Sequence, residues 1–308
     1  MDDTSNARLT IVDLPDEILL TILKNVNVID ILSSLVGLGE RFDRLIVDPL
    51  YIRRVDMTKM MIKNSSYDYI SSSDVQVLSK FCQNILPRIH HHVQYLTLAP
   101  YSIKSILHTV QSYPQLHSLS LVHLHEDVLY KYLTGKTVPF HKIKSRKISP
   151  SKLFTIFPFL YHIDDLILRD LLCKQITRLN IDITPTANLC SENFGKNLAL
   201  ILSLCGRLTD LNFCDMFVTR KCWIFIFPVT STDYISSTLV KLKINVATFI
   251  DCLFLLDGRL DSLSTLIINV SSIFDPTFDI GQAVSRSLHD HIIILYSSVF
   301  LRRENFQD

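Results

Sequence analysis

The sequence is poor in glycine, with seven glycines in 308 residues, and it contains no Gly-rich phosphate loop. It also lacks the H-E-x-x-H zinc motif and the G-x-S-x-G nucleophile motif. Phosphate cradles and nucleophile turns need glycine where the backbone approaches a ligand or turns sharply. We therefore expect neither catalysis nor a bound cofactor.

Charge of one sign is also lacking, because 31 Lys and Arg balance 30 Asp and Glu to a formal charge of +1. No overall field would attract the chain to nucleic acid or to an anionic membrane. The longest apolar runs, at residues 222–229 and 292–296, fall short of the roughly 20 residues that a membrane helix requires. The start MDDTSNARLT has no apolar stretch of signal-peptide length, so we do not expect secretion.

Paired cysteines are absent too, since the seven cysteines are an odd number and form no C-x-x-C motif. They are Cys82, Cys173, Cys190, Cys205, Cys214, Cys222 and Cys252. This spacing argues against a disulfide framework and against a zinc ribbon. A reducing compartment fits best, and we expect the protein in the cytoplasm, the nucleus or both.

The N-terminal part of the chain, up to about residue 51, is predicted to form a compact group of helices. Asp13, Pro15 and the acids after it are typical of a helix start. The helix should run to about Val26, with an apolar stripe that packs on other helices. A second short helix is predicted from Asp30, and a third contains Phe42, Leu45 and Ile46.

A six-residue pattern recurs through the rest of the chain: apolar, two residues, leucine, one residue, apolar. Its central leucines are spaced by 23, 60, 32, 31 and 24 residues, at Leu96, Leu119, Leu179, Leu211, Leu242 and Leu266. Each match predicts a short strand, and amphipathic stretches near 74–86, 102–110 and 191–202 predict helices of an outer layer. The fold class predicted for residues 53–270 is an α/β solenoid with irregular, leucine-rich-repeat-like units.

Two parts of the chain fit the repeat poorly. In the 60-residue gap, Ile163, Leu166 and Leu168 form the candidate strand, but Leu166 precedes Leu179 by only 13 residues. After Val270 the period is lost, so we expect residues 271–308 to be a C-terminal cap, with a helix near 292–300, or a partly disordered tail.

Residues 14–51 resemble the F-box, the module that joins substrate receptors to Skp/cullin/F-box ubiquitin ligases. The resemblance rests on the opening LPDEI, on Leu23, Asp30 and Leu32, and on Arg41, Phe42 and Leu45. The family usually has Trp at the position of Phe42 and often Cys at that of Gly39. Val55–Met57 would be a first, degenerate strand that couples a small three-helix F-box at residues 9–52 to the solenoid.

The resemblance implies a substrate-recognition adaptor that binds a Skp-type adaptor and, through it, a cullin ligase. The implied Skp-contacting residues are Leu14, Pro15, Ile18, Leu19 and Ile22. The helical unit could instead be the N-terminal cap of the solenoid, because the open ends of repeat proteins need covering. The chain would then be a leucine-rich-repeat scaffold or binding protein without a ligase role.

Residues between the inward leucines of each strand should face the concave side of the solenoid, because side chains alternate along a strand. Most of these positions are polar, which predicts a surface for an unknown target protein. The target-binding positions are Tyr95, Thr97, Ser118, Ser120, Arg178, Asn180, Asp182, Asp210, Asn212, Lys241, Lys243 and Asn245, with Thr265 and Asn269 beyond them.

Other candidate sites are better explained by ordinary structure. The run His90–His92 and the group His123, His125, Glu126 and Asp127 suggest metal ligands, but both fit a polar surface better. The basic stretch 141–147 has no interleaved aromatics, so we interpret it as a solvated loop and not as a nucleic-acid site. Trp223 lies in an apolar run and is expected in the core.

Overall fold

The computed structural model describes the chain in separate stretches. These are residues 10–26, 31, 39–46, 48, 52–58, 72–110, 112–124, 126–135, 166–183, 193–213, 224, 226, 235–256, 260–272 and 292–297. The predicted second helix after Asp30, the basic stretch 141–147 and Trp223 lie outside these residues, apart from Ile31.

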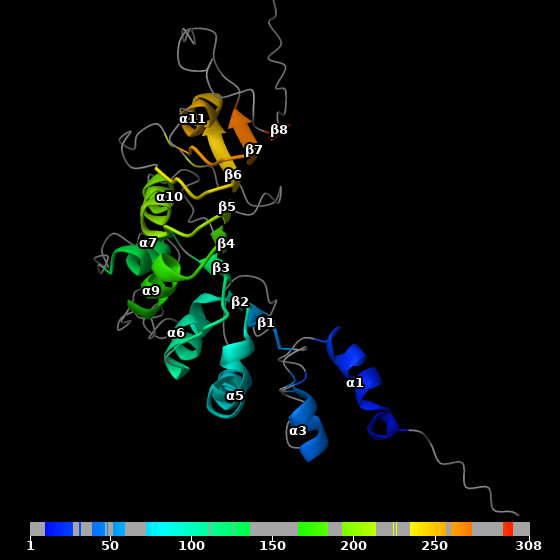
Figure 1. The fold of residues 1–308 in the computed structure, drawn as a ribbon. Coiled ribbons are helices and arrows are strands. Elements are labelled where there is room, and N and C mark those ends of the chain that lie inside the picture. Colours follow the sequence, from blue (N-terminus) through cyan, green and yellow to red (C-terminus); the bar gives the residue numbers. More distant parts are fainter. Residues whose placement is uncertain are drawn as a thin grey trace, which may run out of the picture.

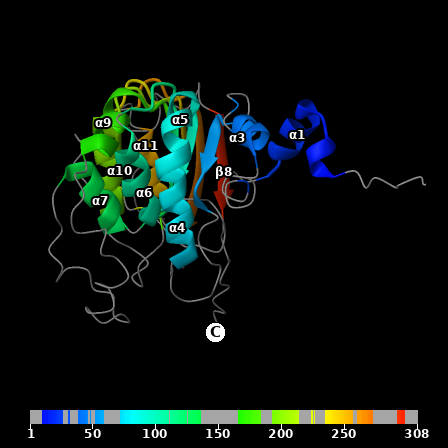
Figure 2. The same cartoon turned by 90° about the horizontal axis from the view of Figure 1, so that it is seen from below.

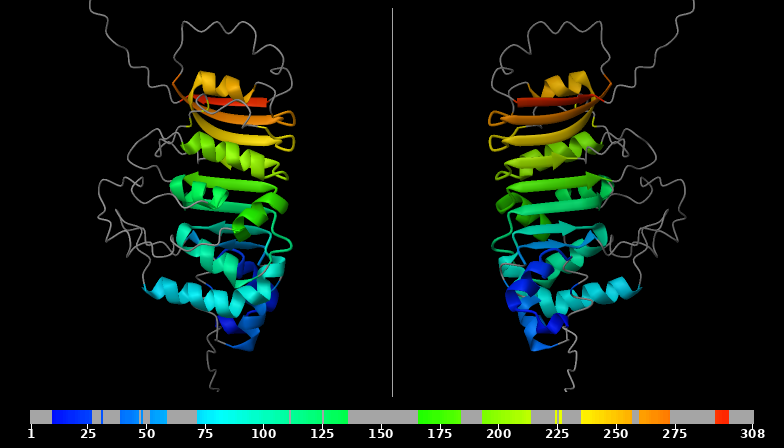
Figure 3. Two further views of the ribbon diagram at one scale, coloured as in Figure 1. Left: turned by 90° about the vertical axis from the view of Figure 1, so that its left-hand side faces the viewer. Right: turned by 90° about the vertical axis from the view of Figure 1, so that its right-hand side faces the viewer.

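One parallel sheet of eight strands organises the molecule, and the strand order follows the order of the chain (Figure 1). The strands stack as successive rungs (Figure 3). They are β1 (Arg54–Asp56), β2 (Tyr95–Leu98), β3 (Ser118–Leu124), β4 (Arg178–Ile183), β5 (Asp210–Phe213), β6 (Lys241–Thr248), β7 (Thr265–Ser272) and β8 (Ile292–Ser297).

The six leucines of the repeated pattern pair in register across β2 to β7, from Leu96 to Leu266. Val55 of β1 pairs with Leu96, so the strand predicted at Val55–Met57 is present, one residue earlier, at Arg54–Asp56. All seven of these side chains are at most 2% exposed, while their neighbours along the strands are mostly half-buried. The period-two alternation therefore separates an apolar face of the sheet from a polar one.

The helices after β1 form a layer on the apolar face of the sheet (Figure 2). The first group is α4 (Ser72–Lys80), the π-helical turn η3 (Phe81–Ile85), α5 (Leu86–Ile89), the 3-10 turn η4 (His90–His92) and α6 (Pro100–Thr109). The second group is α7 (Glu126–Thr134), α9 (Leu166–Lys174), α10 (Asn193–Leu204) and α11 (Phe249–Leu255). Parallel strands need such crossovers, and the crossovers bury the leucines.

The helices near 74–86, 102–110 and 191–202 are confirmed, but two other predictions are wrong. Leu166 and Leu168 lie in helix α9 and not in a strand. Ile292–Ser297 forms strand β8, paired with β7, where a helix was expected. Because β8 pairs with β7, the regular order of strands continues beyond Val270. Helices α7 and α11 were not predicted.

The N-terminal part lies at the β1 end of the sheet (Figure 1). It consists of the 3-10 turn η1 (Ile11–Asp13), α1 (Asp16–Leu23) and α3 (Glu40–Ile46). Leu19 of α1 and Phe42 of α3 belong to the same buried cluster as the sheet leucines. Among the described residues, no helix has the length and apolar character required to cross a bilayer.

Candidate interaction surfaces

The first candidate surface is built on α1, whose start is fixed by local chemistry. Pro15 stands at the N-cap, and Asp16 and Glu17 place negative charge in the first turn, where the helix dipole favours it. Asp13 ends the preceding turn η1 and accepts hydrogen bonds from the amide and hydroxyl of Thr10, each at 2.7 Å. These bonds lower the pKa of Asp13 below its ordinary value.

Apolar side chains of η1, α1 and the turn after α1 remain exposed. Ile18 is 49% exposed and Ile22 is 39% exposed, one helical turn apart. The exposed apolar face, as we call it, consists of Ile11, Val12, Pro15, Ile18, Ile22 and Val26. A set of this size at helical spacing is unusual on a surface that contacts only water.

The structure places the five predicted adaptor-contacting residues in three environments. Pro15, Ile18 and Ile22 are exposed, and Leu14 is half-buried. Leu19 is 1% exposed, so it lies inside the chain and not on the exposed face that carries Ile18. One residue step turns a helix by about 100°, which carries Leu19 from the face of Ile18 to the side that packs on the core.

Helix α3 holds the segment before α1 through the side chain of Arg41. Its Nη1 donates to the carbonyl of Val12 at 2.6 Å, and its Nη2 donates to the carbonyl of Leu14 at 2.5 Å. Both carbonyls lie before the first turn of α1 and have no partner inside that helix. Arg41 therefore fixes the direction in which the exposed apolar face points.

The second candidate surface is the open face of the sheet, which we define as the face opposite the helical layer. Two rows of half-buried side chains cross it in register. The first row is Tyr95, Ser118, Arg178, Asp210, Lys241 and Thr265, and the second is Thr97, Ser120, Asn180, Asn212 and Lys243. The structure thus brings ten of the twelve predicted target-binding residues into two adjacent rows.

Side chains of the second row bond to one another. Asn180 Nδ2 donates to Ser120 Oγ at 2.7 Å, and Asn212 Nδ2 donates to Asn180 Oδ1 at 2.5 Å. In the first row, Lys241 Nζ lies 3.8 Å from Asp210 Oδ2. The middle of the open face is therefore polar, and hydrogen bonds order part of it, although Asn212 Oδ1 is buried there without a hydrogen-bond partner.

The two remaining predicted positions lie farther along the strands. Asp182 Oδ2 is 3.6 Å from His123 Nδ1. Asn245 is only 2% exposed, so its prediction as an open surface residue is wrong. Ile224 forms a parallel bridge with Val246 and exchanges backbone hydrogen bonds with Asn245 and Ala247, which continues the pairing along the edge of β6 beyond β5.

Two residues of this surface were missed by sequence reasoning. Arg54 of β1 pairs in register with Tyr95, so it extends the first row by one strand. Aligning RVDM with YLTL would have found it. His117 precedes β3 and reaches Arg178, with its Nε2 2.8 Å from the Arg178 Nη2. No periodic signal marks this residue.

The metal-like histidine groups do not form a binding site within the described part of the chain. No group of three or more His, Cys, Asp or Glu residues there could hold a metal ion. His90, His91 and His92 form the turn η4, in which successive rings pack on each other. His123 pairs with Asp182, and His125 lies outside the described residues.

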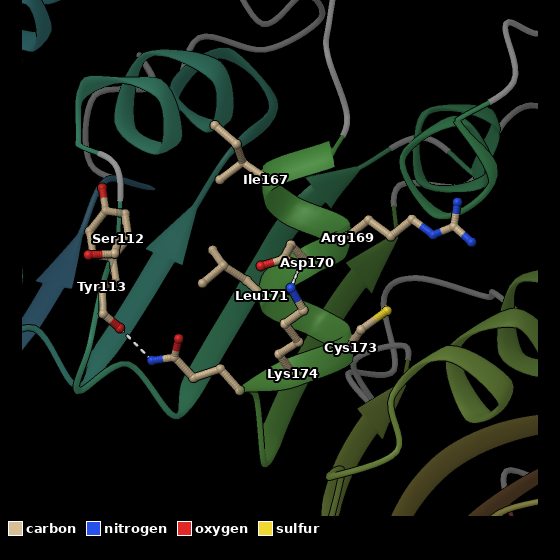
Figure 4. A pocket seen from close by; sticks show the side chains of 9 residues that line it. Ser112, Tyr113, Ile167, Arg169, Asp170, Leu171, Cys173 and Lys174 are labelled. Atoms are coloured by element: carbon tan, nitrogen blue, oxygen red, sulfur yellow. Dashed lines mark hydrogen bonds and ion pairs between the residues drawn. The ribbon is translucent and has the colours of Figure 1, made fainter.

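A hollow of about 650 Å³ lies beside α9 in the helical layer (Figure 4). Its polar groups are bonded to one another: Lys174 Nζ is 2.5 Å from Asp170 Oδ1, and the Gln175 amide donates to the Tyr113 carbonyl. The Tyr113 hydroxyl donates to the Ile106 carbonyl at 2.6 Å. This lining offers no paired nucleophile and base, so it does not suggest an active site.

No protein-family model matches this sequence, and no curated protein matches it.

Proposed function

We propose that this chain is a substrate-recognition adaptor of a Skp/cullin/F-box ubiquitin ligase. In this proposal residues 9–52 act as the F-box, and the sheet with its outer helices acts as a leucine-rich-repeat-like solenoid. The exposed apolar face binds a Skp-type adaptor, and the open face binds the target protein. The chain makes and breaks no bond itself. It raises the concentration of the target near the ligase's ubiquitin-carrying partner.

The observation that carries the proposal is the exposure of Ile18 and Ile22 on a helix whose other side is buried. Leu19 and Leu23 are 1% and 3% exposed and already attach α1 to the core. A helix that served only to cap the sheet would need this buried side alone. The second apolar side remains exposed among the described residues, and the F-box resemblance would assign it to an adaptor.

Capture of a purified Skp-type adaptor tests the proposal. An aspartate placed at the centre of an apolar interface should cost at least ~2 kcal/mol, or roughly 30-fold in affinity. Ile18→Asp should therefore abolish capture by the whole chain. Val75→Asp is the matched control, because Val75 is also an exposed helical residue, at 45%, but lies on α4.

Circular dichroism and thermal melting should be the same for wild type and both variants, since neither side chain is buried. Failure of the wild-type chain to capture the adaptor would contradict the proposal, as would equal capture by wild type and Ile18→Asp. The chain would then stand as a scaffold or binding protein with no ligase role.

A further inference from the structure

The open face of the sheet changes in character between β6 and β7. Its second row is polar at Asn180 and Asn212. The row continues with Lys243 on β6 and then with Ile267 on β7, which pair in register. Ile294 takes the next register position on β8. These three strands lie side by side at one end of the sheet (Figure 3), so a boundary between charged and apolar residues runs along this end.

Lys243 has no acidic neighbour on the open face. Its side chain is half-buried, and the register positions beside it on the adjoining strands are Asn212 and Ile267. The nearest positions along β6 on the same face are Lys241 and Asn245. Within the part of the chain that the structure describes, Lys243 forms no ion pair.

The acids on the two preceding strands are engaged by other side chains. Asp210 of β5 lies with its Oδ2 3.8 Å from Lys241 Nζ, and Asp182 of β4 lies with its Oδ2 3.6 Å from His123 Nδ1. Lys241 and Asp210 therefore largely neutralise each other. This end of the open face keeps the positive charge of Lys243, next to an isoleucine.

We propose that Lys243 and Ile267 bind an amphipathic helix of the target protein that presents a carboxylate beside an aliphatic side chain. The carboxylate pairs with the Lys243 ammonium group, and the aliphatic side chain packs on Ile267. One cation matches one carboxylate in charge, and the apolar neighbour excludes water from one side of the pair.

The spacing of the two positions favours a helix over an extended segment. Neighbouring strands of a sheet lie about 4.8 Å apart, which sets the separation of Lys243 and Ile267 across the sheet. Residues three or four apart on a helix are separated by about 5–6 Å and share one side. Residues on one side of an extended strand are about 6.6 Å apart, which fits less well.

An anionic membrane fits this end of the sheet less well than a helix of a protein. Membrane surfaces attract clusters of basic residues around an apolar face that enters the lipid. Here β6 carries two lysines on the open face, and one of them lies beside Asp210. Ile267 is half-buried, so little of its surface is available for insertion.

The inference rests on the proposed role of the open face as the target-binding surface, and it does not depend on the adaptor contact of α1. It adds to the proposed function the kind of segment that the target presents.

Immobilised peptide pools test the inference with the full chain. The peptides have about 16 residues and alanine-rich degenerate flanks, a length that can form a helix on binding. The first pool has glutamate with leucine four positions away on either side. The second has lysine in place of glutamate, and the third has the leucine two positions from the glutamate. The first pool should retain wild-type chain roughly tenfold above the second, the size of one charged hydrogen bond, and several-fold above the third.

Variants of the two proposed contact residues identify where the peptides bind. Lys243→Gln should remove the preference for glutamate, and Lys243→Glu should reverse it in favour of the lysine pool. Ile267→Ala should weaken retention by the first pool several-fold. Lys104→Gln is the matched control and should keep the preference, because Lys104 is also half-buried but lies on α6 in the helical layer. Thermal melting should be the same for wild type and the lysine variants.

Equal retention of wild-type chain by the first two pools would overturn the inference, and so would a glutamate preference that survives Lys243→Gln. Stronger retention by the third pool than by the first would overturn the helical spacing. Tighter binding to phosphatidylserine vesicles than to the first pool would overturn the choice of partner.

Capture of the Skp-type adaptor is measured on the same variants and should not change, because α1 lies at the β1 end of the sheet (Figure 1). Normal adaptor capture without a glutamate preference would overturn this inference alone. Failure of wild-type chain to capture the adaptor would instead contradict the proposed function.

Discussion

Arg41 of α3 and Asp16 of α1 form a hydrogen-bonded ion pair, with the Arg41 Nε and Nη2 at 2.7 and 2.6 Å from Asp16 Oδ1. The pair joins two elements that are 25 residues apart in the sequence. Together with the bonds from Arg41 to the carbonyls of Val12 and Leu14, it fixes the first turn of α1 against α3. These contacts of Arg41 therefore hold in place the helix that carries the exposed apolar face.

Replacement of Arg41 by glutamine should weaken adaptor capture about tenfold, because the start of α1 loses its anchor. The loss of unfolding free energy should be only about 1 kcal/mol, since the paired side chains are 33% and 41% exposed and water screens them. Arg44→Gln is the control, because Arg44 is 74% exposed and lies 3.9 Å from Asp16. Titration of adaptor binding and urea unfolding of both variants measure the two effects, and equal behaviour would contradict the positioning role.

Leu19 and Ile18 should separate stability from binding. Leu19→Ala removes a side chain that is 1% exposed and should lower the unfolding free energy by about 2–4 kcal/mol. Ile18→Ala should change it by no more than about 0.5 kcal/mol but should reduce adaptor capture. Urea denaturation and adaptor titration on both variants test this pair. A large loss of stability in Ile18→Ala would mean that Ile18 packs within the chain.

The strands could be predicted because their signal is local and repeated. Apolar residues that alternate with polar ones around a central leucine specify a strand that is buried on one face. When the next unit has the same pattern, its leucine pairs with the leucine of the unit before it, which gives the parallel register. Leu166 and Leu168 carry the same kind of spacing over a short stretch. Leu171 and Leu172 continue the apolar positions after Leu168 at a spacing of three and four, which is the helical period, and this segment forms helix α9.

Other features could not be read from local pattern. Ile292–Ser297 is apolar throughout, and a short apolar run does not distinguish helix from strand. It pairs with β7, a contact that depends on the whole sheet. Asn245 is buried although the alternation along β6 predicts an open side chain, and no periodicity announces the nearby bridge between Ile224 and Val246. Helix α11, by contrast, had a readable start in Thr248 and Asp251, which form a capping box.

Asp251 should be important for the stability of the C-terminal part of the sheet. Its side chain is fully buried and accepts hydrogen bonds from the Thr248 amide at 2.9 Å, the Thr248 hydroxyl at 2.6 Å and the Ile226 amide at 2.7 Å. Asp251→Ala leaves these donors unpaired and should cost about 2–4 kcal/mol of unfolding free energy. Asp261→Ala, at an exposed turn, should cost no more than about 0.5 kcal/mol. Urea denaturation of the two variants compares them, and equal midpoints would contradict the role assigned to Asp251.

Buried cysteines should make the protein sensitive to alkaline pH. Burial raises the pKa of the Cys205 thiol to about 12 from an ordinary value of 9.0. Burial, followed by the nearby charge of Asp251, raises the pKa of the Cys252 thiol to about 11. Between pH 9 and these values the folded chain keeps protons that the unfolded chain has lost.

Because the folded state binds more protons in that range, the unfolding free energy should fall as pH rises above 9, by roughly 1 kcal/mol per pH unit for each thiol. The contribution is fully present below pH 9 and is lost as pH passes through the raised values. Urea denaturation at pH 8, 9 and 10 measures the slope. The double variant Cys205→Ala, Cys252→Ala should be less stable at pH 8, because each change leaves a small cavity, but its stability should fall less steeply above pH 9. An unchanged slope would mean that the alkaline loss comes from other groups, and that these two thiols reach solvent more readily than their burial indicates.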